Sequence, residues 1–263
     1  NVNLLELGPG NGLLSMDIYH YLKSKNINVN DLTLLEKSEY FREKILEKSE
    51  VKVNFIKNIY DYKIDNGDVV FIYSNEFFDA IGSKQFIYDN GNFNEIKISK
   101  NNDEYLLIKD STIISRELLN IYSSYNFKDN DILEHSNLIL NILSDIQKLE
   151  FKKYFFTTTD YGYTKLPFKS TLRLLSNHKK LNLFDKFENV DYSFGVNFEL
   201  MNSFFLKNNP SIIYQKDLIL NNLPSEYLKS SDKNIKEMID LISGKKFGGM
   251  GTSFLNLSFK KNE

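Results

Sequence analysis

Three closely spaced glycines follow the first apolar segment of the chain and could bring bare backbone against a ligand. Residues 4–7 have the apolar character of a buried strand, and the run Gly8-Pro9-Gly10-Asn11-Gly12 comes directly after them. Glycines between a strand and a helix are typical of nucleotide-binding loops. The proline lacks the N–H that a pyrophosphate would require, and Glu6 adds a carboxylate before the turn. The loop therefore suits a ligand with a cationic or amino-acid group, although a turn that only joins strand to helix is the alternative.

A second acidic residue follows the next apolar run. Residues 32–35 read as a buried strand that ends at Glu36. In a doubly wound sheet, a carboxylate at the end of the second strand can bind both ribose hydroxyls of a nucleoside. We therefore expect Glu36 to anchor an adenosine-like ligand. The alternative is a solvated glutamate at a helix start, because Lys37-Ser38-Glu39 begins the next helix.

Two further carboxylates follow the fourth apolar run, in the segment Ser74-Asn75-Glu76-Phe77-Phe78-Asp79-Ala80. If a helix begins near Asn75, Glu76 and Asp79 lie three residues apart and share a face. Paired carboxylates could hold a guanidinium group by charge-assisted hydrogen bonds and accept a proton from it. The alternative is structural, with Asn75 as a helix N-cap and the carboxylates complementing the helix dipole. The sequence leaves both interpretations open.

The elements that would position these residues alternate between strands and helices. Short apolar runs predict seven strands, at residues 4–7, 32–35, 51–56, 68–73, 154–159, 211–214 and 252–259. Helices are expected after Gly12, around residues 132–149 and 198–206, and from the N-cap Asp232 to Gly244. Seven strands with a ligand loop after the first predict an α/β fold, the seven-stranded Rossmann-like sheet of class I S-adenosylmethionine (AdoMet) methyltransferases.

Composition and charge favour one globular domain over residues 1–263. The 263 residues are 41% hydrophobic and 14% aromatic, which suffices for one large α/β core. Two insertions are expected, a hairpin over about 84–130, where polar and apolar residues alternate, and a loop over about 163–197. Because the first strand begins almost at Asn1, we also expect an N-terminal segment to be missing from this sequence.

Several function classes are disfavoured by the same numbers. The net charge of −2 and the pI near 6.0 give no basic footprint for nucleic acid. No apolar stretch is long enough to span a membrane. The chain has no cysteine and three histidines, which excludes a disulfide framework or a structural zinc site and disfavours a catalytic metal. We therefore expect a protein that needs neither metal nor nucleic acid.

Several runs together resemble one protein family over nearly the whole chain. The glycine run with Glu6 and the Asn75–Ala80 run resemble the MidA-type protein arginine methyltransferases, whose mitochondrial members assist assembly of respiratory complex I. The likeness continues in four later runs, which are Asp160-Tyr161-Gly162-Tyr163, Ser170-Thr171-Leu172-Arg173, Asp191-Tyr192-Ser193-Phe194-Gly195-Val196-Asn197-Phe198 and Met250-Gly251-Thr252-Ser253-Phe254. The resemblance implies AdoMet as cofactor and an arginine of a protein, such as a complex I subunit, as acceptor.

The resemblance also implies roles for single residues. Glu6, Gly8, Gly10 and Glu36 would bind AdoMet, and Asn58 and Ile59 of the Lys57-Asn58-Ile59 segment would flank the adenine. Asn75, Glu76 and Asp79 would face the acceptor, and Asp160 and Tyr161 would line its channel. The chain departs from the family at Ile81-Gly82-Ser83 and at Ser193-Phe194-Gly195-Val196. These differences concern contacts to the substrate.

Two other functions remain open from the sequence. A methyltransferase-like fold could assist assembly of a partner without turnover, or the enzyme could methylate a small molecule or a lipid. AdoMet affinity and the fate of a labelled methyl group separate these possibilities. The resemblance implies either a bacterial cytoplasm or a mitochondrial matrix, and the sequence does not indicate the oligomeric state.

Overall fold

The structure is a computed structural model, which describes residues 1–63, 69–102, 104–111, 116–177, 179–185, 189–244 and 251–261. The chain divides into two compact units. Unit 1 comprises Asn1–Asp79, Asn141–Tyr163 and Val196–Glu263, and unit 2 comprises Ala80–Leu140 and Thr164–Gly195. All residues that the sequence predicts for the cofactor and the acceptor belong to unit 1.

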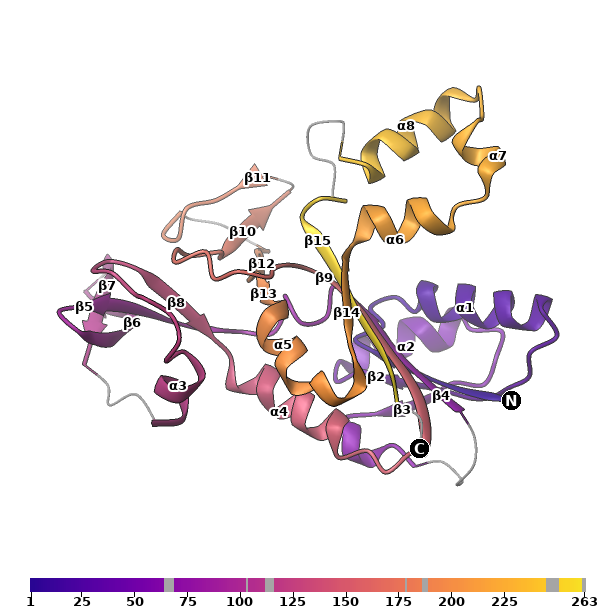
Figure 1. Cartoon of the computed structure of the whole chain (residues 1–263), viewed down its shortest axis with the longest axis horizontal. Coiled ribbons are helices and arrows are strands. Elements are labelled where there is room, and N and C mark those ends of the chain that lie inside the picture. The colour runs from indigo at the N-terminus through magenta and orange to yellow at the C-terminus, as the bar shows by residue number, and fades with distance from the viewer. Residues whose placement is uncertain are drawn as a thin grey trace. The chain divides into compact units, whose positions relative to one another are not determined.

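Unit 1 is built around a mixed sheet with the strand order β14-β15-β9-β4-β1-β2-β3 (Figure 1). Strands β3, β2, β1, β4 and β9 are parallel to one another. Strand β15 runs antiparallel to β9, and β14 runs antiparallel to β15. A short strand, β13, pairs with β9 off this path. The strand bounds are β1 Val2–Leu7, β2 Val29–Leu35, β3 Asn54–Ile56, β4 Val69–Asn75, β9 Lys153–Tyr163, β13 Val196–Asn197, β14 Ser211–Tyr214 and β15 Phe254–Lys261. The predicted α/β fold with a seven-stranded sheet is confirmed.

Some element boundaries differ from the prediction. The third strand covers only Asn54–Ile56, although apolar residues begin at Val51. The helix expected over 132–149 is a strand, β8 (Ile132–His135), followed by helix α4 (Asn137–Gln147). The apolar residues Ile132 and Leu133 fit either element, so periodicity alone could not separate them. The first residue of the predicted strand 68–73 and Met250 lie outside the described residues.

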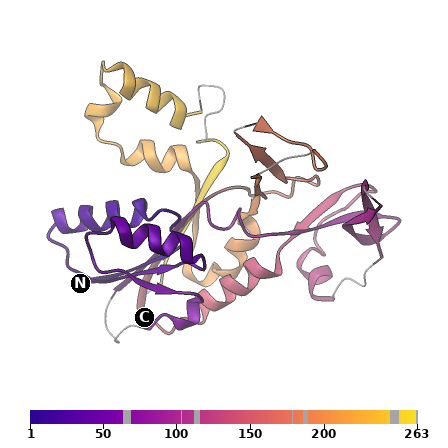
Figure 2. The same cartoon turned by 180° about the vertical axis from the view of Figure 1, so that it is seen from behind.

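Helices α1 (Leu13–Ser24) and α2 (Glu39–Lys48) cover one face of the sheet (Figure 2). The strands contribute Leu4, Leu34 and Tyr73 to a buried cluster, and Ile45 of α2 completes it. Apolar side chains of α1, including Met16, pack against the same cluster. Their burial fixes the start of α1 above the carboxyl end of β1.

Helix α5 (Phe198–Phe204) covers the opposite face. Phe155 of β9 contacts Phe71, and Phe71 packs against the buried cluster on the face that α1 and α2 cover. Because side chains alternate along a strand, the next residue, Phe156, points to the other face. There the ring of Phe205, directly after α5, lies 5.7 Å from Phe156 and 4.4 Å from Phe259 of β15. Buried aromatic rings therefore join α5 to the centre of the sheet.

The remaining helices of unit 1 are short, and no helix in the described ranges is long and apolar enough to cross a membrane. They are η1 Ile59–Asp61, η2 Leu206–Asn208, α6 Gln215–Asn222, α7 Ser225–Leu228 and α8 Lys233–Ile242. The predicted N-cap at Asp232 is confirmed, because its carboxylate accepts the N–H groups of Asn234 and Ile235. Helix α8 ends at Ile242, and Gly244 follows in the left-handed conformation with φ of 73°.

Unit 2 contains two small antiparallel sheets. Strands β5 (Lys84–Asp89), β6 (Asn92–Asn101) and β7 (Glu104–Asp110) form successive hairpins, and β8 pairs with β5. This is the antiparallel structure that the alternating pattern predicted. The second insertion is less irregular than expected, because it contains strands β10 (Arg173–Ser176), β11 (Lys179–Lys180) and β12 (Asp191–Ser193). Helix α3 spans Arg116–Ile121.

Candidate active site

The parallel strands of unit 1 present their carboxyl ends at one edge of the sheet. The chain leaves β1 for β2 on one side and later returns to β4 on the other, so the carboxyl ends of β1 and β4 form a topological switch point. The residue after each strand is tied to the neighbouring strand. The N–H groups of Gly8, Glu36 and Glu76 donate to backbone carbonyls of adjacent strands at 3.1, 3.1 and 2.9 Å. This edge therefore brings together loops that are far apart in sequence.

The glycine loop requires glycine for two different reasons. Gly8, Gly10 and Gly12 have φ values of 68°, 54° and 79°, a region that side chains disfavour. A Cβ atom on Gly8 would lie 2.5 Å from Cδ2 of Phe77, so this loop and the segment after β4 are in close contact. A Cβ atom on Gly10 would meet nothing within 4 Å. Gly10 therefore borders open space, as a backbone that receives a ligand should.

Glu6 is buried below this loop rather than exposed to a ligand. Glu6 is 2% exposed, and its carboxylate accepts a hydrogen bond from the hydroxyl of Ser15 in the first turn of α1. Because the Ser15 hydroxyl has one proton, the hydroxyl of Tyr73, 2.7 Å away, donates to Ser15. Burial raises the pKa of Glu6 to about 7, and hydrogen bonds from Ser15 oppose the shift. Glu6 therefore positions α1, which corrects the expectation of a carboxylate that faces the ligand.

Glu36 lies directly after β2 and is half-buried. Its Oε1 accepts the Ser38 N–H at 2.7 Å, and its backbone carbonyl accepts hydrogen bonds from the guanidinium of Arg42. Within the described part of the chain, Oε2 accepts no hydrogen bond. The backbone is thus fixed on both sides, while one carboxylate oxygen remains available for a ligand hydroxyl.

Asn58 and Ile59 follow β3 at the same edge. Asn58 precedes the 3-10 turn η1, and its amide donates to the carboxylate of Asp61 at 3.2 Å. Ile59 is almost completely buried. The turn therefore offers the half-buried Asn58 and its backbone to a ligand, with Ile59 as an anchor beneath.

The segment after β4 does not begin a helix. Glu76 instead has φ of 51°, and Glu76 and Asp79 point into different surroundings because Glu76 is exposed and Asp79 is 7% exposed. The expected shared helical face is therefore wrong, and so is the N-cap role of Asn75. Asn75 is exposed, and its amide donates to Glu76 Oε1 at 3.3 Å.

The conformation of Glu76 is unusual within this chain. Nine non-glycine residues in the described ranges have positive φ, and seven of them are asparagines, which tolerate this region. The exceptions are Glu76 and Phe168. A left-handed glutamate beside the glycine loop indicates that local backbone strain is held in place by surrounding contacts.

Asp160 is fully buried, with 0% of the residue exposed, and cannot line an open channel as expected. Its Oδ1 accepts the backbone N–H groups of Phe78 and Asp79 at 3.0 and 3.2 Å, and Oδ2 accepts the Thr158 hydroxyl at 2.7 Å. Burial raises the pKa of Asp160 to about 8, with the Asp79 carboxyl adding to the shift and the hydrogen bonds opposing it. Tyr161 is half-buried, and its ring meets Phe254 of β15 at 6.2 Å.

Sequence reasoning missed several residues that hold this site together. Ser15 binds Glu6, Phe77 packs on Gly8, and Ser74 donates to Thr158 at 2.7 Å. One signal was present, because Thr158 and Asp160 lie two residues apart at the end of a predicted strand and must share a face. The partner strand could not be identified without the sheet order.

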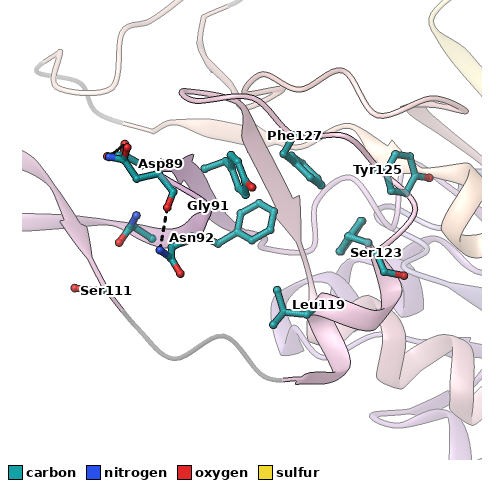
Figure 3. Close-up of a pocket in the computed structure, with 13 residues that line it drawn as sticks. Asp89, Gly91, Asn92, Ser111, Leu119, Ser123, Tyr125 and Phe127 are labelled. Carbon is teal, nitrogen blue, oxygen red and sulfur yellow. Dashed lines mark hydrogen bonds between the residues drawn. The ribbon is translucent and has the colours of Figure 1, made fainter.

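A separate cavity of about 770 Å³ lies within unit 2 (Figure 3). Half-buried rings of Tyr88, Phe93 and Phe127 meet one another there at 4.8 to 5.8 Å. The lining residues are Tyr88, Asp89, Asn90, Gly91, Asn92, Phe93, Asn94, Ser111, Leu119, Tyr122, Ser123, Tyr125 and Phe127. This cavity contains no residue that the sequence predicts for the cofactor or the acceptor. Across the described residues there is also no group of three His, Asp or Glu that could hold a metal.

Two of the buried carboxyls, Glu6 and Asp160, give the stability a pH dependence with a defined sign. The ordinary pKa values of Glu6 and Asp160, 4.5 and 3.8, rise to about 7 and about 8 in the folded protein. The folded state therefore holds extra protons, and the associated stability is lost as the pH rises through these windows, by at most about 1.4 kcal/mol per pH unit for each group. We expect Glu6→Gln and Asp160→Asn to reduce the stability difference between pH 5 and pH 8 in urea unfolding. An unchanged stability difference between pH 5 and pH 8 in both variants would contradict the raised pKa values.

A protein-family model described as "Putative S-adenosyl-L-methionine-dependent methyltransferase" matches residues 1–212. Among solved structures, the native structure of an uncharacterised superfamily protein from Burkholderia thailandensis is similar with a TM-score of 0.80 and 15% identity, over 98% of this chain and 74% of that one. A Burkholderia thailandensis member of that superfamily bound to S-adenosyl-homocysteine gives 0.75 and 14%, over 98% and 71%. At these identities the likeness shows the fold. A sequence search among curated proteins gives no match.

Proposed function

The chain belongs to the family of S-adenosyl-L-methionine-dependent methyltransferases whose model it matches, and from this premise we propose that it methylates an arginine side chain of a protein. The acceptor suggested by the resemblance to MidA-type enzymes is a subunit of respiratory complex I. The observation that carries the proposal is the exposed carboxylate of Glu76. It lies in a strained loop that packs through Phe77 on the glycine loop.

The residues at the edge of the sheet fit AdoMet. The open space beside Gly10 would receive the amino-acid part of the cofactor, and Glu36 Oε2 would bind a ribose hydroxyl. Asn58 would flank the adenine, with the buried Ile59 anchoring the turn beneath it. The binding of S-adenosyl-homocysteine by the Burkholderia thailandensis protein of the same fold supports this assignment. When bound, AdoMet supplies a methyl group that its sulfonium already activates.

The remaining chemistry falls to the segment after β4. A guanidinium is a planar cation, so the Glu76 carboxylate would hold it by charge-assisted hydrogen bonds and fix one nitrogen toward the methyl group. The nitrogen loses a proton when it is methylated, and Glu76 would accept it. Asn75, which donates to Glu76, would orient the carboxylate. Tyr161 would contribute a wall of the acceptor site.

Labelled methyl transfer tests the proposed activity. The purified chain and AdoMet with a labelled methyl group are incubated with cell protein, and the products are separated by gel and by solvent extraction. We expect label in protein that, after hydrolysis, is found in methylated arginine. Label in an extractable product would favour a small-molecule acceptor. AdoMet binding without transfer would favour an assembly factor.

Replacing Glu36 tests the cofactor assignment. We expect Glu36→Ala to weaken AdoMet binding by about 1 to 3 kcal/mol, the cost of losing a hydrogen bond to a charged group. Glu39→Ala is the matched control, because it removes a carboxylate from the first turn of α2. Calorimetry on both folded variants measures the effect. Equal AdoMet affinity in the two variants would remove Glu36 from the cofactor site.

A further inference from the structure

The segment after β4 is held by two consecutive residues of β9. The Glu76 N–H donates to the Thr159 carbonyl at 2.9 Å, and the N–H groups of Phe78 and Asp79 both donate to Asp160 Oδ1. Three of the four backbone amides from residue 76 to residue 79 are thus bound to the end of β9. The segment folds over this strand end as a preformed loop.

The carboxylate that binds these amides is itself fixed. Asp160 Oδ2 accepts the Thr158 hydroxyl, which in turn accepts the Ser74 hydroxyl, both at 2.7 Å. Ser74 pairs with Thr158 in the register of β4 and β9, so the chain of hydrogen bonds ties the two strands together directly beneath the loop. All three side chains are buried, which excludes water as a competing partner.

These contacts explain how Glu76 can hold a left-handed conformation without glycine. Its φ of 51° costs about 1 to 2 kcal/mol, which must be offset by contacts on both sides of the residue. Thr159 fixes the N–H of Glu76 itself, and Asp160 fixes the two amides that follow Phe77. Loss of the Asp160 acceptor would let the loop relax and turn the Glu76 side chain away.

We propose that Asp160 is a positioning residue for methyl transfer, which acts through the backbone of Phe78 and Asp79 to hold Glu76 toward the acceptor. This inference rests on the proposed function. Asp160 does not touch the substrate, and its role differs from that of a channel residue. The chemical requirement is an acceptor oxygen at Oδ1, so asparagine should replace aspartate, whereas alanine should not.

Three variants test this role. We expect Asp160→Asn to transfer methyl groups within about threefold of the wild type, and Asp160→Ala to lower kcat by about tenfold or more, because small misplacements of a reacting group are costly. AdoMet affinity should be unchanged in both. Thr158→Val keeps the shape of the side chain, and we expect a smaller loss in the same direction. Should Asp160→Ala not fold, Thr158→Val carries the test.

A double-mutant cycle separates positioning from general destabilisation. In the Glu76→Gln background, Asp160→Ala should have little further effect if it acts through Glu76. An equal loss in both backgrounds, or a parallel loss of AdoMet affinity, would overturn the proposal. Amide hydrogen exchange supplies an independent readout, because the amides of Phe78 and Asp79 should be protected in the wild type and in Asp160→Asn only. If the wild type methylates no protein, the proposed function fails. Fast exchange of these two amides in the wild type would instead contradict their hydrogen bonds to Asp160, and with them the positioning role.

Discussion

Replacing Gly10 with valine is expected to abolish AdoMet binding, with a loss of affinity of at least about 100-fold, while the protein still folds. A Cβ atom on Gly10 meets no protein atom within 4 Å, so the larger side chain would enter the space that we assign to the cofactor. The φ of 54° adds a backbone cost of about 1 to 2 kcal/mol to folding. Calorimetry with AdoMet and S-adenosylhomocysteine measures the affinity.

Gly91→Val is the matched control for this experiment. Gly91 also has positive φ, 82°, and a Cβ atom there would also meet nothing within 4 Å, but it lies in the β5–β6 turn of unit 2. Both variants should lose similar stability, and only Gly10→Val should lose AdoMet. Wild-type affinity in folded Gly10→Val would refute the cofactor loop, and binding of NADH in place of AdoMet would favour a dinucleotide site.

Replacing Glu76 with glutamine is expected to slow methyl transfer by about 100-fold or more, the usual scale for loss of a positioned electrostatic or acid–base group. Glutamine keeps the shape of the side chain but removes the charge that pairs with arginine. AdoMet affinity should be unchanged. Since no helix begins here, the change should affect stability by less than about 0.5 kcal/mol. Single-turnover transfer to a protein acceptor and thermal melting measure the two effects.

Glu76→Gly is a second variant, for which we expect no loss of stability. Glycine adopts φ near 51° without a steric cost, so this variant should be as stable as the wild type or more stable, by up to about 1 kcal/mol. It should nevertheless be as slow as Glu76→Gln. Near-normal transfer in both variants would remove Glu76 from the catalytic residues and leave the acceptor site unassigned.

The sheet could be predicted from sequence because its signals are local. A buried parallel strand reads as a short apolar run, and residues such as Leu4 and Ile72 lie in runs of this kind. The loops between strands were placed correctly at one edge for the same reason, since parallel strands end together. The segment 132–149 was harder, because the two apolar residues Ile132 and Leu133 before the helix can extend it or begin a strand of their own.

The conformation of residues 76–79, after β4, could not be predicted in this way. A helix beginning near Asn75 was the arrangement considered from the sequence, whereas Glu76 is left-handed. The cause is tertiary, because the amides that would have begun the helix bind Thr159 and Asp160, more than 80 residues away in the chain. For the same reason the burial of Asp160 was unforeseen, since its partners in β15 and in the segment after β4 are both distant in sequence.

The contact between Gly8 and Phe77 has a practical consequence for protein engineering. Any side chain at position 8 would collide with the ring, since a Cβ atom would lie 2.5 Å from it, and removal of the ring would leave the glycine loop without its neighbour. A library that varies residues 76–79 to change which substrate is accepted should therefore keep an aromatic residue at position 77. Position 77 is therefore the point that both segments share, and a design that keeps its ring can vary the neighbouring residues without disturbing the glycine loop.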